Sequence, residues 1–237
     1  MELKPDLAGL ASAYRVLEAH GHADGMLGHV SLRDPLGRGF WIKRASVGLD
    51  EVVGRDQLLL VDFTGVLLEG AGPMHSEWPI HAAVLVARPE ISSVVHTHAP
   101  YAALLSAQDD TITPLTTEGG YFSDASVPVF EADSAHISDL GQATAMATSM
   151  MSGLALLLRN HGLVSCGTTL AQAVVVALFL ERAARQQIHA ASSGLNFRPA
   201  AGSAMKGRAA MLQSSSFVGQ TFDYYVRRTT PSSHSVF

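Results

Sequence analysis

Cysteine is almost absent from this sequence of 237 residues, and Cys166 is the only one. A single cysteine excludes an internal disulfide framework and is typical of a protein from a reducing compartment. Charged residues are also few, at 16%, and the formal net charge of −5 shows no basic surplus. Proteins that bind nucleic acids depend on clustered Lys and Arg to neutralise phosphates. We therefore predict that nucleic acid is not a partner.

Long hydrophobic runs are lacking too. The longest apolar stretches, such as Val174–Leu180, fall far short of the roughly 20 residues that span a bilayer. The first ten residues show no basic segment followed by an apolar one, which is the pattern of a signal peptide. We expect a cytoplasmic protein with no membrane partner. Hydrophobic residues nevertheless make up 47% of the chain, enough to bury a core of ordinary size.

Hydrophobic periodicity predicts helices mixed irregularly with short strands. The helices are expected at 6–20, 76–88, 100–107, 137–151 and 170–192, and the strands at 28–32, 40–42, 57–63, 91–97, 127–130, 154–158 and 163–166. The turn at 34–37 makes the first two strands a hairpin. This order favours an α/β class: one three-layer α/β/α domain around a mainly antiparallel sheet. We assign 1–192 to this catalytic domain and 193–237 to a partly mobile tail with a docking helix at 217–228.

Histidines follow two of the predicted strands. His96 and His98 lie two residues apart at the end of an apolar strand, so both imidazoles point to the same face. His161 lies just beyond another buried strand, and Gly162 after it permits close approach of the backbone. An isolated His-x-His pair more often marks two half-exposed histidines. Three imidazoles at two strand ends instead predict a catalytic divalent-metal site, with zinc, manganese or iron as the ion.

Glu77 is the candidate acid–base group. It is expected in the first turn of a helix that Ser76 caps, where the helix dipole stabilises a carboxylate. Taken alone, such a residue is better interpreted as a solvated glutamate. Beside a metal and partly covered by Trp78, its proton affinity can be tuned for acid–base catalysis.

These motifs together resemble the class II aldolase/adducin family over about residues 6–190. The sequence His75-Ser76-Glu77-Trp78, the Ala-Arg-Pro turn at 87–89, the His-x-His pair and the later Asn-His-Gly at 160–162 occur in the family's order. The resemblance implies the α/β/α fold and a homotetramer with active sites at subunit interfaces. It also implies that His96, His98 and His161 are the metal ligands and that Glu77 is the acid–base carboxylate.

The sequence departs from the sugar-phosphate members of the family at their phosphate-binding elements. His29 replaces the Asn of the Gly-Asn-x-Ser element, and His75 replaces one of two serines, leaving Ser76. Lys43 and Arg44 occupy the region of a Thr-Gly turn. The tyrosine that acts as an acid in the aldolases aligns with Thr117.

The replacements favour a carboxylate over a phosphate as the ligand. An arginine fork suits a carboxylate, so we predict that Arg44, Lys43 and Ser76 bind substrate, and we favour Arg44 of the two cations. His75 and His29 then join Glu77 as catalytic candidates in a crowded ionisable pocket. Three aromatic side chains are candidates for an apolar wall beside a substrate ring, and they fit the hydrophobic core equally well: Trp78, Tyr121 and Phe122.

We predict a divalent-metal carbon–carbon lyase of the family's decarboxylase branch, acting on a hydroxylated aromatic or heteroaromatic mono- or dicarboxylate. Two other enzymes fit the same residues: an aldolase for a small hydroxy acid or aldehyde, and an iron-dependent oxygenase. A non-catalytic, adducin-like interaction module is a further alternative. The intact histidine trio argues against it, because an interaction module has no need of a metal site.

Overall fold

The computed structural model describes residues 4–109, 112–124, 126–132, 136–200 and 203–229, and its centre is one eight-stranded sheet. The strand order is β4-β3-β2-β1-β5-β8-β7-β6. Every neighbouring pair is antiparallel except β6 and β7. The strands are β1 (His29–Arg33), β2 (Phe40–Lys43), β3 (Leu58–Val61), β4 (Leu67–Glu69), β5 (Ser93–Thr97), β6 (Val129–Phe130), β7 (Ala155–Leu158) and β8 (Gly162–Gly167).

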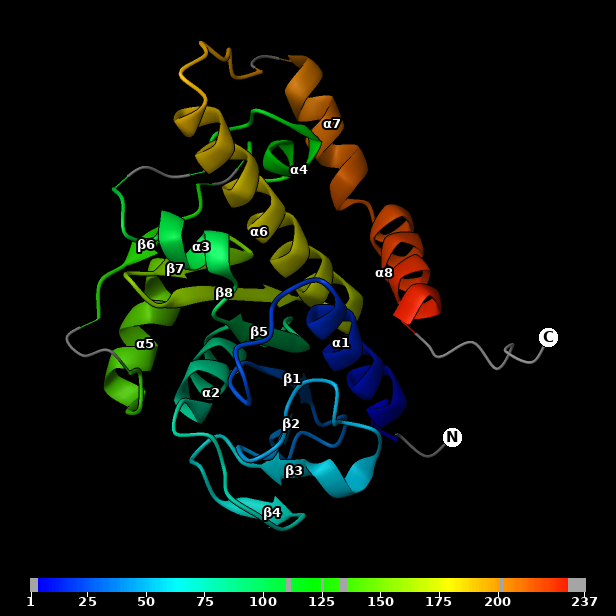
Figure 1. The fold of residues 1–237 in the computed structure, drawn as a ribbon. Helices are drawn as coiled ribbons and strands as arrows, with labels where there is room; N and C mark the ends of the chain where they lie inside the picture. Colours follow the sequence, from blue (N-terminus) through cyan, green and yellow to red (C-terminus); the bar gives the residue numbers. More distant parts are fainter. Residues whose placement is uncertain (1–3, 110–111, 125, 133–135, 201–202, 230–237) are drawn as a thin grey trace.

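Helices cover both faces of this sheet, which confirms the expected three layers (Figure 1). On one face, α1 (Leu7–Ala19) and α6 (Leu170–Ser192) pack together, and α8 (Ser215–Thr229) packs against both. On the other face, α2 (Trp78–Ala87) packs against α5 (Leu140–Ser149). The shorter elements are a 3-10 turn at Arg55–Gln57, α3 (Pro100–Leu105), α4 (Thr117–Gly120) and α7 (Ser203–Gln213).

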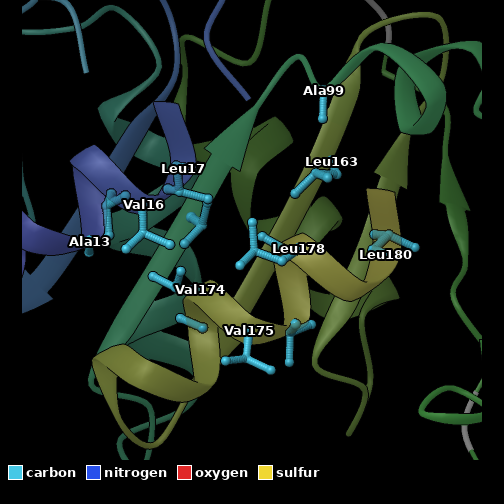
Figure 2. Close-up of a cluster of buried hydrophobic side chains, with 14 of the residues drawn as sticks. Ala13, Val16, Leu17, Ala99, Leu163, Val174, Val175, Leu178 and Leu180 are labelled. Carbon is cyan, nitrogen blue, oxygen red and sulfur yellow. The ribbon is translucent and has the colours of Figure 1, made fainter. Parts of the chain in front are cut away.

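The hydrophobic core is divided by the sheet into two clusters. The larger one joins α1 and α6 to the sheet, with Leu17, Val174 and Leu178 fully buried among their neighbours (Figure 2). The smaller one lies under α2 and α5. Successive side chains along a strand point to opposite faces of the sheet and therefore join opposite clusters. Leu163 belongs to the larger cluster and Val164 to the smaller one. This packing fixes β5 and β8, the neighbouring strands that carry or adjoin the histidines.

Local capping chemistry explains where several helices begin. The Asp6 carboxylate accepts the Gly9 N–H at 2.8 Å, and the Thr169 hydroxyl accepts the Gln172 N–H at 3.1 Å. The prediction that Ser76 caps the next helix is wrong, because α2 has Glu77 at its N-cap position and Ser76 lies outside the helix. Glu77 makes no capping hydrogen bond, which leaves its side chain for other contacts.

Four elements were not predicted: the 3-10 turn at Arg55–Gln57, β4, α4 and α7. β4 is only three residues long, and two glycines make up half of α4, so neither carries a readable period. The expected docking helix at 217–228 is present as α8, which packs on α1 and α6. The boundary at 192 stays a prediction, and residues 201–202 and 230–237 of the tail lie outside the described residues. No helix in the described ranges is long and apolar enough to cross a membrane.

Candidate metal centre

Three elements bring four potential ligands to one point. His96 is on β5 and His98 follows its end, His161 is in the turn between β7 and β8, and Glu77 is at the start of α2. Their ligand atoms all lie within 4.8 Å of one another. The structure therefore brings together the three predicted imidazoles and the predicted carboxylate, in one compact cluster of three nitrogens and one oxygen.

The individual distances show how tightly the cluster is arranged. The Nε2 atoms of His98 and His161 are 2.9 Å apart. The Nε2 atom of His96 lies 3.3 Å from one oxygen of Glu77, and the Nε2 atom of His161 lies 3.7 Å from the other. His96 is fully buried, whereas the side chains of His98 and His161 retain 16% and 14% exposure. A small molecule therefore reaches the cluster from the side of these two histidines.

The turn that carries His161 depends on one glycine. Gly162 on β8 lies against β5 so closely that a Cβ added to it would be 2.4 Å from the Thr97 carbonyl oxygen. Glycine is thus required where the backbones of the two histidine-bearing segments meet, as the sequence suggested. The preceding Asn160 has a left-handed φ of 54°, a conformation that asparagine tolerates, and this tight turn holds His161 over the end of β5.

Contacts behind the cluster orient two of the imidazoles. The Nδ1 atom of His96 lies 3.0 Å from the Leu163 carbonyl oxygen, which makes Nδ1–H the donor and leaves the lone pair on Nε2. The Nδ1 atom of His98 lies 2.9 Å from a carboxylate oxygen of Asp24. Backbone carbonyls and carboxylates hold metal-binding histidines in this way in many proteins.

The donor set fits a divalent cation. Nε2 of His96 is buried without a hydrogen-bond partner, and its lone pair faces a carboxylate oxygen of Glu77. Two acceptors that face each other without a donor repel, and a buried unsatisfied nitrogen costs stability. A cation bound between them would remove both penalties. Three imidazoles and a carboxylate suit zinc, manganese or iron.

Glu77 is held as a carboxylate. Burial raises the pKa of its side chain, but in the metal-free protein the interactions with protonated rings of His96 and His161, together with the Ile137 N–H, outweigh burial and lower the pKa from 4.5 to about 2. The Ile137 N–H donates to Oε1 at 3.2 Å. His136, next to Ile137, places its Nδ1 atom 3.6 Å from the same oxygen. At neutral pH Glu77 is therefore able to accept a proton or to bind a cation.

His75 and His29 lie behind the cluster as neutral, buried rings. The ring centroid of His29 is 4.5 Å from that of His75 and 5.1 Å from that of His96. His29 also places Nδ1 2.6 Å from Nε2 of His81, whose Nδ1 is 2.8 Å from the Ser31 hydroxyl oxygen. Burial lowers the pKa of His75 to about 3 and that of His29 well below its usual value. Both rings are near the cluster, and their catalytic roles stay predictions.

Lys43 and Arg44 occupy different surroundings. Lys43 is fully buried, and its Nζ atom lies 2.8 Å and 2.7 Å from the carbonyl oxygens of Met26 and Val47 and 3.0 Å from Nε2 of His75. These three partners match the three donors of an ammonium group. Arg44 borders a hollow of about 340 Å³ that contains no residue of the cluster. The sequence favoured Arg44, yet Lys43 is the cation that contacts His75, beside the cluster.

The remaining candidates from the sequence lie in different surroundings, some exposed near the cluster and some in the core. Ser76 is exposed beside Glu77. Tyr121 and Phe122 belong to the large core cluster, which agrees with the second of the two interpretations, that they are core residues. Trp78 packs over Gly65, with a Cβ added there falling 2.4 Å from its ring.

Sequence reasoning missed four residues, namely Asp24, His22, His81 and His136. Asp24 and His22 lie in one loop between α1 and β1, where His22 places Nδ1 2.9 Å from the Thr97 hydroxyl oxygen. The local signal was that His22 and Asp24 lie between Gly21 and Gly25. This pattern indicates a turn but does not show which distant residue either side chain contacts. Only the tertiary fold reveals these contacts.

Comparison with known proteins agrees with the site. Residues 8–188 match the model of the Class II Aldolase and Adducin N-terminal domain. The chain belongs to the class II aldolase/adducin family. The resemblance carried by the motifs is thereby confirmed over most of the chain.

Relatives within the family have different activities in their names. The 3,4-dihydroxyphthalate decarboxylase of Terrabacter sp. is 31% identical over 201 residues, which cover 78% of this chain and 81% of the relative. The 5-methylthioribulose-1-phosphate/5-deoxyribulose-1-phosphate aldolase of Rhodospirillum rubrum is 29% identical over 185 residues, covering 75% and 78%. Both names describe lyases, which supports a lyase here without deciding between decarboxylation and aldol cleavage.

A solved structure confirms the class II aldolase fold. An aldolase II superfamily protein from Pseudomonas syringae superposes with a TM-score of 0.84 at 23% identity, covering 96% of this chain and 92% of that one. At this identity the likeness concerns the fold alone.

Proposed function

We propose that this chain is a divalent-metal-dependent decarboxylase of a hydroxylated aromatic or heteroaromatic carboxylate. The observation that carries the proposal is the cluster of Glu77, His96, His98 and His161, with ligand atoms within 4.8 Å of one another. The family membership and the decarboxylase relative support the choice of reaction. A bound divalent cation supplies Lewis-acid stabilisation of the negative charge that develops as a carbon–carbon bond breaks.

Glu77 is the group that moves a proton in this proposal. A carboxylate with a pKa of about 2 is deprotonated in the resting protein, so it must first accept a proton. The substrate hydroxyl group is the donor within the proposed chemistry. As carbon dioxide leaves, the electron pair of the broken bond stays on the ring carbon, and Glu77 returns the proton to that carbon. Solvent then reprotonates the hydroxyl oxygen, which closes the proton balance.

The buried cation behind the site favours an anionic substrate. Lys43 donates to His75, and His75 lies two residues before Glu77. All three donors of Lys43 are engaged by Met26, Val47 and His75, so its role is to hold His75 and to provide positive potential. Direct contact with the substrate carboxylate is proposed for the exposed Ser76, which is next to Glu77. The same role for Arg44 rests on the sequence alone, because Arg44 borders a hollow that contains no residue of the cluster.

The deciding experiment compares two reactions on one preparation. Protein loaded with zinc, manganese or iron is assayed for carbon dioxide release from 3,4-dihydroxyphthalate and for aldehyde release from 5-deoxyribulose 1-phosphate. We expect carbon dioxide release that requires the metal and disappears in His98→Ala. Aldehyde release without carbon dioxide from any aromatic acid would show an aldolase instead, the alternative that the Rhodospirillum rubrum relative favours. We also propose a cytoplasmic homotetramer with active sites at subunit interfaces.

A further inference from the structure

A second hollow, remote in sequence from the metal centre, lies between α4 and α6. Its volume is about 680 Å³. We call it the α4–α6 hollow, and its lining is Leu115, Thr116, Glu118, Arg182, Arg185, Gln186, His189, Ala190 and Phe197. None of these residues belongs to the metal cluster. Five of them repeat on α6 at spacings of three and four residues, so they share one face of that helix.

Two arginines give the hollow its positive charge, and each guanidinium lies over an aromatic ring rather than beside a carboxylate. The guanidinium carbon of Arg185 lies 5.6 Å from the ring centroid of Tyr101. That of Arg182 lies 5.2 Å from the ring centroid of Tyr225, and Arg182 donates to the Tyr225 hydroxyl oxygen at 2.6 Å. A ring face orients a guanidinium without neutralising it. Both forks are thus positioned with their positive charge retained.

The supports of Arg185 are themselves fixed. Tyr101 is in the first turn of α3, where the buried Glu181 accepts its backbone N–H at 3.1 Å and that of Ala102 at 2.7 Å. The ring of His189 lies 5.7 Å from that of Tyr101. Arg185 therefore rests on a ring whose backbone is tied to α6. A site whose charged groups are held before binding loses less entropy when a ligand arrives.

Few carboxylates are available in the hollow to neutralise Arg182 and Arg185. Glu118 is the one carboxylate among the described lining residues. Its Oε2 atom accepts the Gln186 side-chain amide at 3.4 Å and lies 3.3 Å from the Thr116 hydroxyl, whose nearer acceptor is the Gln186 side-chain oxygen. No ion pair joins Arg182 or Arg185 to a carboxylate among the described residues, and the nearest acidic influence on Arg185 is the charge of the buried Glu181, whose oxygens accept the Tyr101 and Ala102 N–H groups. Leu115, Ala190 and Phe197 form the apolar part of the lining.

We infer that the α4–α6 hollow binds an organic dianion with an apolar body, such as an aromatic dicarboxylate. Arginine forks pair with carboxylates in a bidentate manner, and the apolar lining accommodates the ring. Inorganic phosphate shares the charge but lacks the apolar body, so it should bind more weakly. This site stands on its own residues and does not depend on the reaction proposed for the metal centre.

Calorimetry with phthalate on the metal-free, full-length protein tests this inference, because phthalate then has no metal to chelate. We expect one phthalate per chain, binding about 10- to 100-fold weaker in Arg185→Gln and at an intermediate level in Arg185→Lys, which keeps the charge but loses the fork. Arg228→Gln is the matched control, since Arg228 is exposed on α8 outside the hollow lining, and it should bind as the wild type does.

Two further anions, benzoate and inorganic phosphate, are compared with phthalate. Benzoate, with one carboxylate, should bind at least about tenfold more weakly than phthalate and lose less in Arg185→Gln, because a single group engages fewer donors. Equal binding of phthalate to Arg185→Gln and Arg228→Gln would overturn the assignment. So would inorganic phosphate binding as tightly as phthalate, or no phthalate binding at millimolar concentration. Activity of the metal-loaded enzyme is not needed for any of these outcomes.

Discussion

Replacing Glu77 by glutamine separates proton transfer from the architecture of the site. The amide has nearly the same shape, and its oxygen can still accept the Ile137 N–H that Oε1 accepts at 3.2 Å. It cannot carry a proton between substrate atoms. We expect turnover to fall about 10²- to 10⁴-fold, the usual contribution of a positioned acid–base group. This loss corresponds to about 3–5 kcal/mol in activation free energy.

The same substitution also changes the free energy of unfolding, by an amount that follows from the lowered pKa of Glu77. The Glu77 carboxyl has a pKa of about 2 in the folded protein against an ordinary value of 4.5. A lowered pKa stabilises the fold above pH 4.5, and that contribution disappears as the pH falls towards 2. Its size is at most about 3 kcal/mol. The metal-free Glu77→Gln protein should therefore be less stable than the wild type at pH 7 and nearly equal to it only at about pH 2 and below.

The assay measures carbon dioxide release, bound metal and denaturant unfolding on the same protein samples. Glu90→Gln is the matched control, because it makes the same chemical change at an exposed carboxylate paired with Arg88. We expect metal content near the wild-type level in Glu77→Gln, since three imidazoles remain. Normal turnover in Glu77→Gln would refute the proton-transfer role. Loss of metal together with turnover would show that Glu77 acts chiefly as a ligand.

Three further predictions concern the metal and the assembly. Replacing any of His96, His98 or His161 with alanine should lower metal content and activity together, so a fully loaded and active His98→Ala protein, measured by elemental analysis, would contradict the ligand assignment. Asp24→Asn keeps a hydrogen-bond acceptor for Nδ1 of His98 but loses its charge, and it should weaken metal affinity about 10- to 100-fold in competition with a chelator, whereas Asp62→Asn on a distant turn should not. Sedimentation should give a tetramer at micromolar concentration, and a 25 kDa species alone would exclude active sites shared between subunits.

The sequence was informative where chemistry and backbone periodicity coincide. His96 and His98 at a strand end, and Gly162 after His161, were correctly interpreted because alternation along a strand and the space of a missing side chain are local properties. The partners of Asp24 and His22 were not predictable, since they lie 74 and 75 residues further along the chain. Lys43 and Arg44 illustrate the same limit. Two adjacent cations look alike in a sequence, and only the fold shows that Lys43 contacts His75.

Lys43 supplies the last prediction, because its burial has a measurable pH signature. Burial lowers the pKa of Lys43 from 10.5 to about 8. Between these values the unfolded chain binds a proton that the folded protein has released, so the free energy of unfolding rises with pH over this window. The rise is at most about 3 kcal/mol. Tyr121 and Cys166, whose pKa values burial raises to about 12, change stability in the opposite direction at alkaline pH, but both remain in Lys43→Met.

The difference in unfolding free energy between wild type and Lys43→Met therefore isolates this one group. We expect the difference to shift in favour of the wild type by up to about 3 kcal/mol from pH 8 to 10.5, measured by urea unfolding. Catalysis should respond in the other direction, because deprotonation removes the positive charge beside His75 and turnover should decline above about pH 8. A difference curve that stays flat across this range would mean that the carbonyl oxygens of Met26 and Val47 keep the ammonium charged, and the alkaline decline in turnover would then need another cause.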